Sequence, residues 1–153
     1  MSTQLNVRNY RAVILDLDGV ITRTASLHAK AWEQMFSEFL DRWMTEHDTS
    51  VRQIDIDEDY PKYIDGKPRY DGVRSFLESR GIDLPKGSPD DPPDARTVSG
   101  LGNRKNELFR EQMQKEGVHV FEDTIALVQS WRRDGIKIGV ISSSKNCKAI
   151  LQA

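Results

Sequence analysis

Two aspartates, one residue apart, close the most apolar segment of the sequence. Asp16 and Asp18 end the run AVILDLD, and Gly19 follows at once. In a strand these two side chains point to the same side, and open α/β sheets bind ligands beyond the carboxyl ends of their strands. A carboxylate placed there can attack a phosphoryl group and form an acyl phosphate, and neighbouring carboxylates attract a cation such as Mg²⁺. The pair therefore indicates phosphoryl transfer with a bound metal, or else a turn that caps a helix.

A second polar cluster follows another strand-like segment near the end of the sequence. The stretch GVISSSKN places Ser142 directly after an apolar run, with Ser143 beside it. A hydroxyl and the neighbouring backbone N–H groups can hold a phosphate and stabilise the negative charge that develops during its transfer. A serine-rich turn of this kind can also cap a helix. Its combination with the aspartate pair favours phosphate binding.

The elements that position these residues are predicted from apolar spacing. Residues 12–18 form a continuous apolar run, which is typical of a parallel strand covered on both faces. Residues 136–142 form a second strand, and the helical spacing in residues 123–135 ends at Gly135 just before it. A helix followed by a strand is half of a βαβ unit. The two ends of the sequence therefore predict a Rossmann-like parallel sheet.

The segment between the two strands is predicted to be helical. Residues 27–47 repeat apolar side chains along one helical face, and residues 71–81 and 103–117 are two further helical candidates. Residues 82–98 are rich in Pro, Asp and Gly. They predict a long loop, and a loop of this length is either functional or mobile.

This order of elements predicts an α/β fold with an inserted helical cap domain. We expect residues 1–26 and 118–153 to form the sheet core and residues 27–117 to form the insertion. A single mixed α+β domain is the alternative arrangement.

Composition bounds the classes of partner. The chain has 153 residues, 37% apolar and 30% charged, with a net charge of −2. We therefore expect neither a nucleic acid nor an anionic membrane as a partner, and no apolar run is long enough to span a bilayer. The N-terminal ten residues lack the pattern of an export signal. The single cysteine, Cys147, excludes an intrachain disulfide and fits a reducing cytoplasm.

The aspartate motif carries a resemblance to a known family. The stretch DLDGVIT resembles the first motif of the haloacid dehalogenase superfamily of phosphotransferases, DxDGx[TV]. The resemblance implies that Asp16 is the nucleophile and Asp18 the general acid and base. It also implies that Mg²⁺ is held by the Asp16 carboxylate and the Asp18 backbone carbonyl. Phosphate binding is assigned by the same resemblance to Ser142, Ser143 and Gly19.

Within this superfamily the sequence looks most like the β-phosphoglucomutase branch. The opening DLDGVITRTASLHAKAW is very similar to that of the branch and places Thr24, His28 and Trp32 at matching positions. The resemblance implies that His28 couples closure of the cap to acid–base chemistry. A surface histidine on a helix is the alternative.

Further matches lie in the cap and after the second strand. The stretch DGKPRYDG puts Arg69 where the family binds the distal phosphate of a sugar phosphate, a task that suits a guanidinium fork. The stretch NRKN implies that Lys105 and Asn106 line the substrate cleft, although a solvated charge cluster explains it equally well. The stretch SSSKN adds Lys145 and Asn146 as polar groups on the substrate or phosphate side.

The sequence also departs from the family pattern. Arg23 stands where the family commonly has an acidic residue, which alters the charge beside the cleft and the balance of cap closure. The superfamily also uses a later lysine and a later acidic pair, and nothing after Ser142 fills those roles. We therefore expect the chain to be the N-terminal part of a longer enzyme, with an incomplete core and half of a metal site.

Two classes of function follow from these observations. The first is Mg²⁺-dependent phosphoryl transfer on a small sugar phosphate through an aspartyl phosphate, by a phosphatase or a phosphomutase. His28 and Arg69 favour a mutase, whereas Arg23 and the loop at residues 85–98 do not. The second is a non-catalytic, sugar-phosphate-binding or regulatory module of a larger carbohydrate-processing polypeptide. A truncated product without function is a third possibility.

Overall fold

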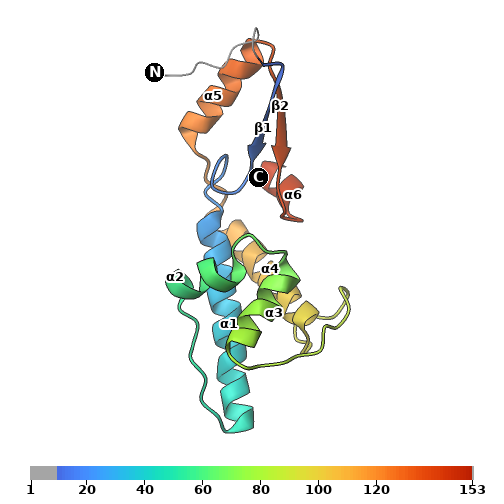
Figure 1. Ribbon diagram of the computed structural model, residues 1–153. Coiled ribbons are helices and arrows are strands. Elements are labelled where there is room, and N and C mark those ends of the chain that lie inside the picture. The colour runs from blue at the N-terminus through green and yellow to red at the C-terminus, as the bar shows by residue number, and fades with distance from the viewer. Residues whose placement is uncertain (1–9, 153) are drawn as a thin grey trace. The chain divides into compact units, whose positions relative to one another are not determined.

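The structure is a computed structural model that describes residues 10–152 (Figure 1). Residues 1–9 and Ala153 lie outside the described part. The prediction about an export signal therefore falls almost entirely outside the described residues. The chain divides into two compact units. The second unit is formed by residues 27–116, and the first is formed by the residues on either side of them. In chain order the elements are β1 (Ala12–Asp16), α1 (Ala25–His47), α2 (Ile56–Asp59), the π-helical turn η1 (Tyr60–Ile64), α3 (Arg69–Ser79), α4 (Val98–Glu116), α5 (Glu122–Arg133), β2 (Lys137–Ile141) and α6 (Cys147–Gln152).

The first unit contains a parallel pair of strands with a helix packed against it. β1 pairs with β2 in a register that sets Ala12 opposite Lys137 and Asp16 opposite Ile141. α5 packs against β2, and the chain turns from α5 into β2 at Gly135, whose φ of 79° is the left-handed conformation that favours glycine. The predicted α/β architecture with a parallel sheet is confirmed.

Only one face of this sheet is covered by the described residues. On the other face Ile14 is 67% exposed and Ile141 is 61% exposed. The run at residues 12–18 predicted a strand covered on both faces, and the open face departs from that expectation.

The second unit is a helical domain built around aromatic side chains. Phe36 from α1 lies between Trp32, at 5.4 Å between ring centroids, and Phe76 of α3, at 3.8 Å. Leu108 and Phe109 of α4 are also fully buried. The helices predicted over residues 27–47, 71–81 and 103–117 are all present, because their apolar faces meet in this core. Within residues 10–152, no helix combines the length and the apolar character needed to cross a bilayer.

The long loop between α3 and α4 is tied to its surroundings. α4 begins at Val98, five residues earlier than predicted, because the hydroxyl of Thr97 caps it by accepting a hydrogen bond from the Gly100 N–H at 2.9 Å. The same hydroxyl donates to the Asp91 carboxylate at 2.6 Å. The backbone N–H of Ser99 donates to the carbonyl of Lys86 at 3.0 Å. These bonds give the loop a defined conformation, and a function for it stays a prediction.

A buried ion cluster organises the segment between α1 and α3, where the sequence predicted no helix. The Asp59 side chain is 1% exposed and pairs with Arg52, at 2.8 Å, and with Arg80. The Asp55 N–H also donates to it at 2.9 Å. Burial raises the pKa of Asp59, but the Asp55 N–H and the two guanidinium groups outweigh it and hold the pKa below the ordinary value. These contacts tie the end of the short helix α2 to the neighbouring Arg52 and Asp55 and to the distant Arg80.

Replacing Asp59 with asparagine tests this cluster. We expect the free energy of unfolding to fall by about 3 kcal/mol, because the buried guanidinium of Arg80 loses its counter-charge. Since folding lowers the pKa of Asp59, its stabilisation is full above the ordinary pKa of 3.8 and is lost as the pH falls through the lower, folded value. Urea unfolding followed by tryptophan fluorescence, repeated down to about pH 2, measures both effects.

The matched control is Asp57→Asn, a change at an exposed carboxylate on the same helix. We expect it to shift the free energy of unfolding by less than about 0.5 kcal/mol. Equal losses in the two variants would show that the Asp59 cluster has no special role.

Candidate active site

The carboxyl end of the parallel strand pair brings three predicted site residues together. Asp16 is the last residue of β1 and is exposed, and one of its carboxylate oxygens accepts the Leu17 N–H at 2.8 Å. Asp18 follows two residues later and is half-buried. Ser142 comes directly after β2, and its hydroxyl lies 3.4 Å from the Asp18 carboxylate. The strand pairing therefore gathers the two carboxylates and the hydroxyl at one edge of the sheet.

Buried threonines hold Asp18 in place. The Thr24 hydroxyl donates a short hydrogen bond to Asp18 Oδ1 and lies 2.9 Å from the Thr22 hydroxyl, which in turn contacts the Leu17 carbonyl at 3.2 Å. Both threonines are at most 2% exposed. Thr24, which resemblance assigned to the substrate side, is thus a direct partner of Asp18. Thr22 was missed from the sequence, where the alternation in GVITRT was the available signal.

Gly19 makes the turn that separates Asp18 from these threonines. Its φ is 79°, which a residue with a side chain rarely adopts. Its N–H donates to the Thr22 carbonyl at 2.8 Å. The Gly19 N–H therefore closes a turn in this structure, and the predicted role of Gly19 in binding phosphate stays a prediction.

The serine-rich turn after β2 is stabilised by its own hydroxyl groups. The Ser142 hydroxyl accepts the Ser144 N–H at 3.0 Å, and the Ser144 hydroxyl accepts the Asn146 N–H at 3.1 Å. Ser142 is therefore a turn cap and also a neighbour of Asp18. Ser143 and Lys145 are exposed beside it, whereas Asn146 is 5% exposed.

The two segments that connect the units pair with each other beside Asp18. Arg23 donates its N–H to the His119 carbonyl at 2.8 Å, and Phe121 donates its N–H to the Ile21 carbonyl at 3.0 Å. The Arg23 guanidinium lies 4.6 Å from the centroid of the Phe121 ring. Arg23, which stands where the family commonly has an acidic residue, therefore links one connecting segment to the other.

Replacing Arg23 with alanine tests this fastening. We expect the amide hydrogens of residues 23 and 121 to exchange about threefold faster, because a partly exposed cation–π contact opposes local opening. Hydrogen exchange followed by NMR measures both amides, and Arg133→Ala, at an exposed arginine of α5, is the control. Unchanged exchange at residues 23 and 121 would show that the stacking does not stabilise the connection.

A second group of predicted residues meets inside the helical unit. The Lys105 ammonium lies 2.6 Å from His28 Nδ1 and 5.2 Å from the ring centroids of Trp32 and Phe109. His28 stacks on Phe109 at 4.1 Å. Lys105 is only 5% exposed, so a solvated charge cluster does not describe it. Because an ammonium only donates, Nδ1 acts as the acceptor and a neutral His28 carries its proton on Nε2.

Arg69 and Asn106 complete the predicted residues of the helical unit. Arg69 is the first residue of α3, is half-buried and lies over the ring of Tyr70, with 5.2 Å between the guanidinium carbon and the ring centroid. Asn106 is half-buried on α4, next to Lys105. Trp32 is 4% exposed, so it supports Lys105 from within the core.

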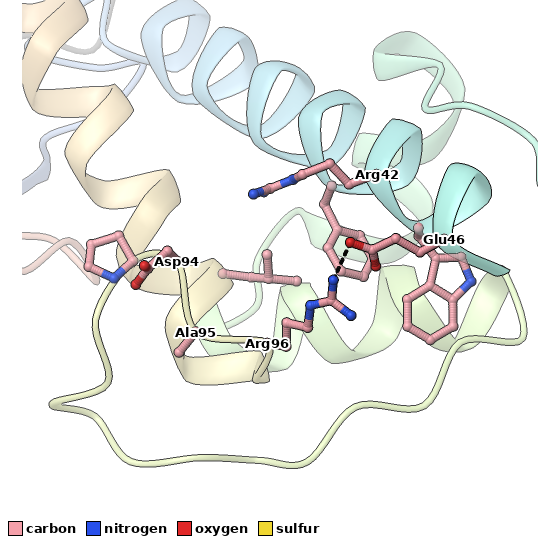
Figure 2. A pocket seen from close by; sticks show the side chains of 9 residues that line it. Arg42, Glu46, Asp94, Ala95 and Arg96 are labelled. Carbon is pink, nitrogen blue, oxygen red and sulfur yellow. Dashed lines mark hydrogen bonds and ion pairs between the residues drawn. The ribbon is translucent and has the colours of Figure 1, made fainter.

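A separate small pocket lies between α1 and the long loop. Figure 2 shows Arg96 of the loop reaching Glu46 of α1, with Arg42 and Asp94 at the rim. None of the predicted site residues lines this pocket.

The site and the fold define the class of protein. Residues 10–152 match the haloacid dehalogenase-like hydrolase family. The chain therefore belongs to this family of hydrolases.

Particular relatives narrow the comparison. The chain is 45% identical over 141 residues to a β-phosphoglucomutase of Mycobacterium tuberculosis, a match that covers 92% of the chain and 54% of that protein. It is also 33% identical over 146 residues to an uncharacterized glycosyl hydrolase of the same species. This match covers 95% of the chain and 11% of that hydrolase. The solved structure of a β-phosphoglucomutase from Clostridium difficile shares the fold, with a TM-score of 0.66 at 22% identity, over 94% of this chain and 56% of that one. The chain thus spans about half the length of the mutases that it matches.

Proposed function

We propose that the chain carries the nucleophile and the acid–base group of a Mg²⁺-dependent enzyme that transfers a phosphoryl group on a small sugar phosphate. The observation that carries the proposal is the convergence of Asp16, Asp18 and Ser142 at the carboxyl end of β1 and β2. The similarity to β-phosphoglucomutases supports the sugar phosphate as the substrate class. Both a phosphatase and a phosphomutase fit this arrangement.

We assign the roles of the two carboxylates by the family resemblance. The exposed Asp16 carboxylate attacks phosphorus, so that an oxygen–phosphorus bond forms and the bond from phosphorus to the sugar oxygen breaks. Asp18 gives its proton to the departing oxygen. It later takes a proton from the attacking water or sugar hydroxyl, whose oxygen bonds to phosphorus as the bond from phosphorus to Asp16 breaks. The Thr24 hydroxyl orients Asp18 for this exchange, and Ser142 binds the transferring phosphate together with Ser143.

Magnesium fits the chemistry of these donors but is only partly held by them. The Asp16 carboxylate and the Asp18 carbonyl are the hard oxygen ligands that Mg²⁺ prefers, yet the ion needs a near-octahedral set. No group of three or more His, Cys, Asp or Glu side chains in residues 10–152 could hold a metal. When bound, the ion neutralises charge on the phosphoryl oxygens. We place its remaining ligands, and a phosphate-bridging lysine, in further polypeptide, and expect the 153-residue chain alone to have little or no turnover.

The helical unit supplies the substrate contacts in this proposal. As a cap, it would bind the sugar through His28, Lys105 and Asn106 and the distal phosphate through Arg69. Lys145 and Asn146 would contribute from the turn after β2. The Lys105 contact supports this role for His28, because it leaves Nε2 as the proton-bearing nitrogen.

Replacing Asp16 with asparagine tests the nucleophile in a protein that carries the complete catalytic core. We expect turnover of an aryl phosphate and of glucose 1-phosphate to fall by roughly a thousandfold or more, because no acyl phosphate can form. Asp123→Asn, at an exposed carboxylate of α5, should leave turnover unchanged. Undiminished activity in the Asp16 variant would sink the proposal. Phosphorus-31 NMR of the products separates transfer to water from transfer to a sugar hydroxyl.

A second candidate is a sugar-phosphate-binding module without catalysis. The observation in its favour is the match to 11% of a much longer glycosyl hydrolase, where such a unit is one part of a large polypeptide. Calorimetric titration of glucose phosphates and Mg²⁺ into a protein with the complete core, beside an activity assay, decides between the two. Tight binding without turnover supports the module, and turnover supports the enzyme.

A further inference from the structure

The residue after Arg69 is locked between two helices. The Tyr70 hydroxyl donates to the Asn103 side chain at 2.9 Å. Its ring lies against the backbone of Gly102, where an added Cβ would stand 2.5 Å from a ring carbon. The absence of a side chain at this glycine therefore admits the Tyr70 ring, and Asn103 fixes the position of its hydroxyl.

Asn103 also fastens the long loop between α3 and α4. Its side-chain amide donates to the carbonyls of Pro89, at 3.0 Å, and Asp91, at 2.8 Å. One side chain thus joins the loop, α4 and Tyr70. Residues 85–98, which the sequence marked as unusually long, have a defined attachment next to α3.

Arg69 rests on this assembly and has an unsatisfied donor. Its guanidinium lies over the Tyr70 ring. Its Nε is buried and has no hydrogen-bond partner among the described residues. Such a buried N–H is costly unless an acceptor reaches it, and a phosphate oxygen is an acceptor of the kind that a guanidinium binds in two places.

We propose that Tyr70 and Asn103 are positioning residues for Arg69, and that the loop at residues 85–98 acts on phosphate specificity through them. This proposal rests on the proposed function, in which Arg69 binds the distal phosphate of the substrate. The ring fixes the plane of the guanidinium, Asn103 fixes the ring, and the loop fixes Asn103.

Binding of glucose 6-phosphate to the 153-residue chain tests the proposal. Calorimetric titration measures the dissociation constant of every variant, and in the variants that keep Arg69 its Nε–Hε signal in NMR spectra reports the exchange of that proton with solvent. Tyr70→Phe removes the hydrogen bond between Tyr70 and Asn103, whereas Asn103→Ala removes that bond and the two bonds from Asn103 to the loop. We expect each to raise the dissociation constant about fivefold and to speed exchange of the Arg69 proton. Because Asn103→Ala already removes the bond that is lost in Tyr70→Phe, the double variant should lose about as much as Asn103→Ala alone.

Two controls separate the possible outcomes. Arg74→Ala removes an exposed arginine of the same helix and should change nothing, whereas Arg69→Ala should remove most of the binding. If Arg69→Ala leaves binding intact, the proposed role of Arg69 fails. If Arg69→Ala weakens binding but Tyr70→Phe and Asn103→Ala do not, the positioning role is overturned. Thermal unfolding identifies any variant that has lost its fold. If Asn103→Ala is unfolded, Tyr70→Phe, which keeps the aromatic ring, tests the positioning role by itself.

Discussion

The parallel pairing of β1 with β2 is the constraint on which the candidate active site depends. Asp18 and Ser142 are 124 residues apart in the chain, and their contact exists because two short strands end at the same edge. A one-residue slip in this pairing would turn every side chain of a strand to the other face. It would therefore break the contact and turn Asp16 away from the open side of the sheet. The apolar run before Asp16 is thus as much a part of the site as the carboxylates themselves.

The connecting segments add a second layer of positioning. Thr22 and Thr24 hold Asp18 through hydroxyl contacts. The same short stretch pairs with residues 119–121, which lead into α5. The group proposed to move protons is therefore fixed by the residues through which the chain passes from one unit to the other. The guanidinium of Arg23 also stacks on the ring of Phe121 and adds a side-chain contact between the two connecting segments.

The sequence predicted the features whose signals are local. The apolar run before Asp16 predicted a strand, and the spacing of Trp32, Phe36 and Phe39 predicted a helix. Both elements are present, although the strand has one open face instead of two covered ones. Asp16, Asp18 and Ser142 were also predicted to lie at one end of the sheet, because each ends a strand or follows one within two residues. What the sequence could not show is pairing between distant residues. The helix α2 depends on Asp59 meeting Arg80, and the order of the long loop depends on Asn103.

The central claim is that Asp16 is the residue that becomes phosphorylated. The most direct test is reductive trapping in a protein with the complete core, in which borohydride converts an aspartyl phosphate into homoserine that mass spectrometry then locates. With glucose 1-phosphate and Mg²⁺ present, homoserine is predicted at position 16 and at no other aspartate, and it should be absent without the sugar phosphate. Homoserine at a different aspartate, or none during active turnover, would contradict the account.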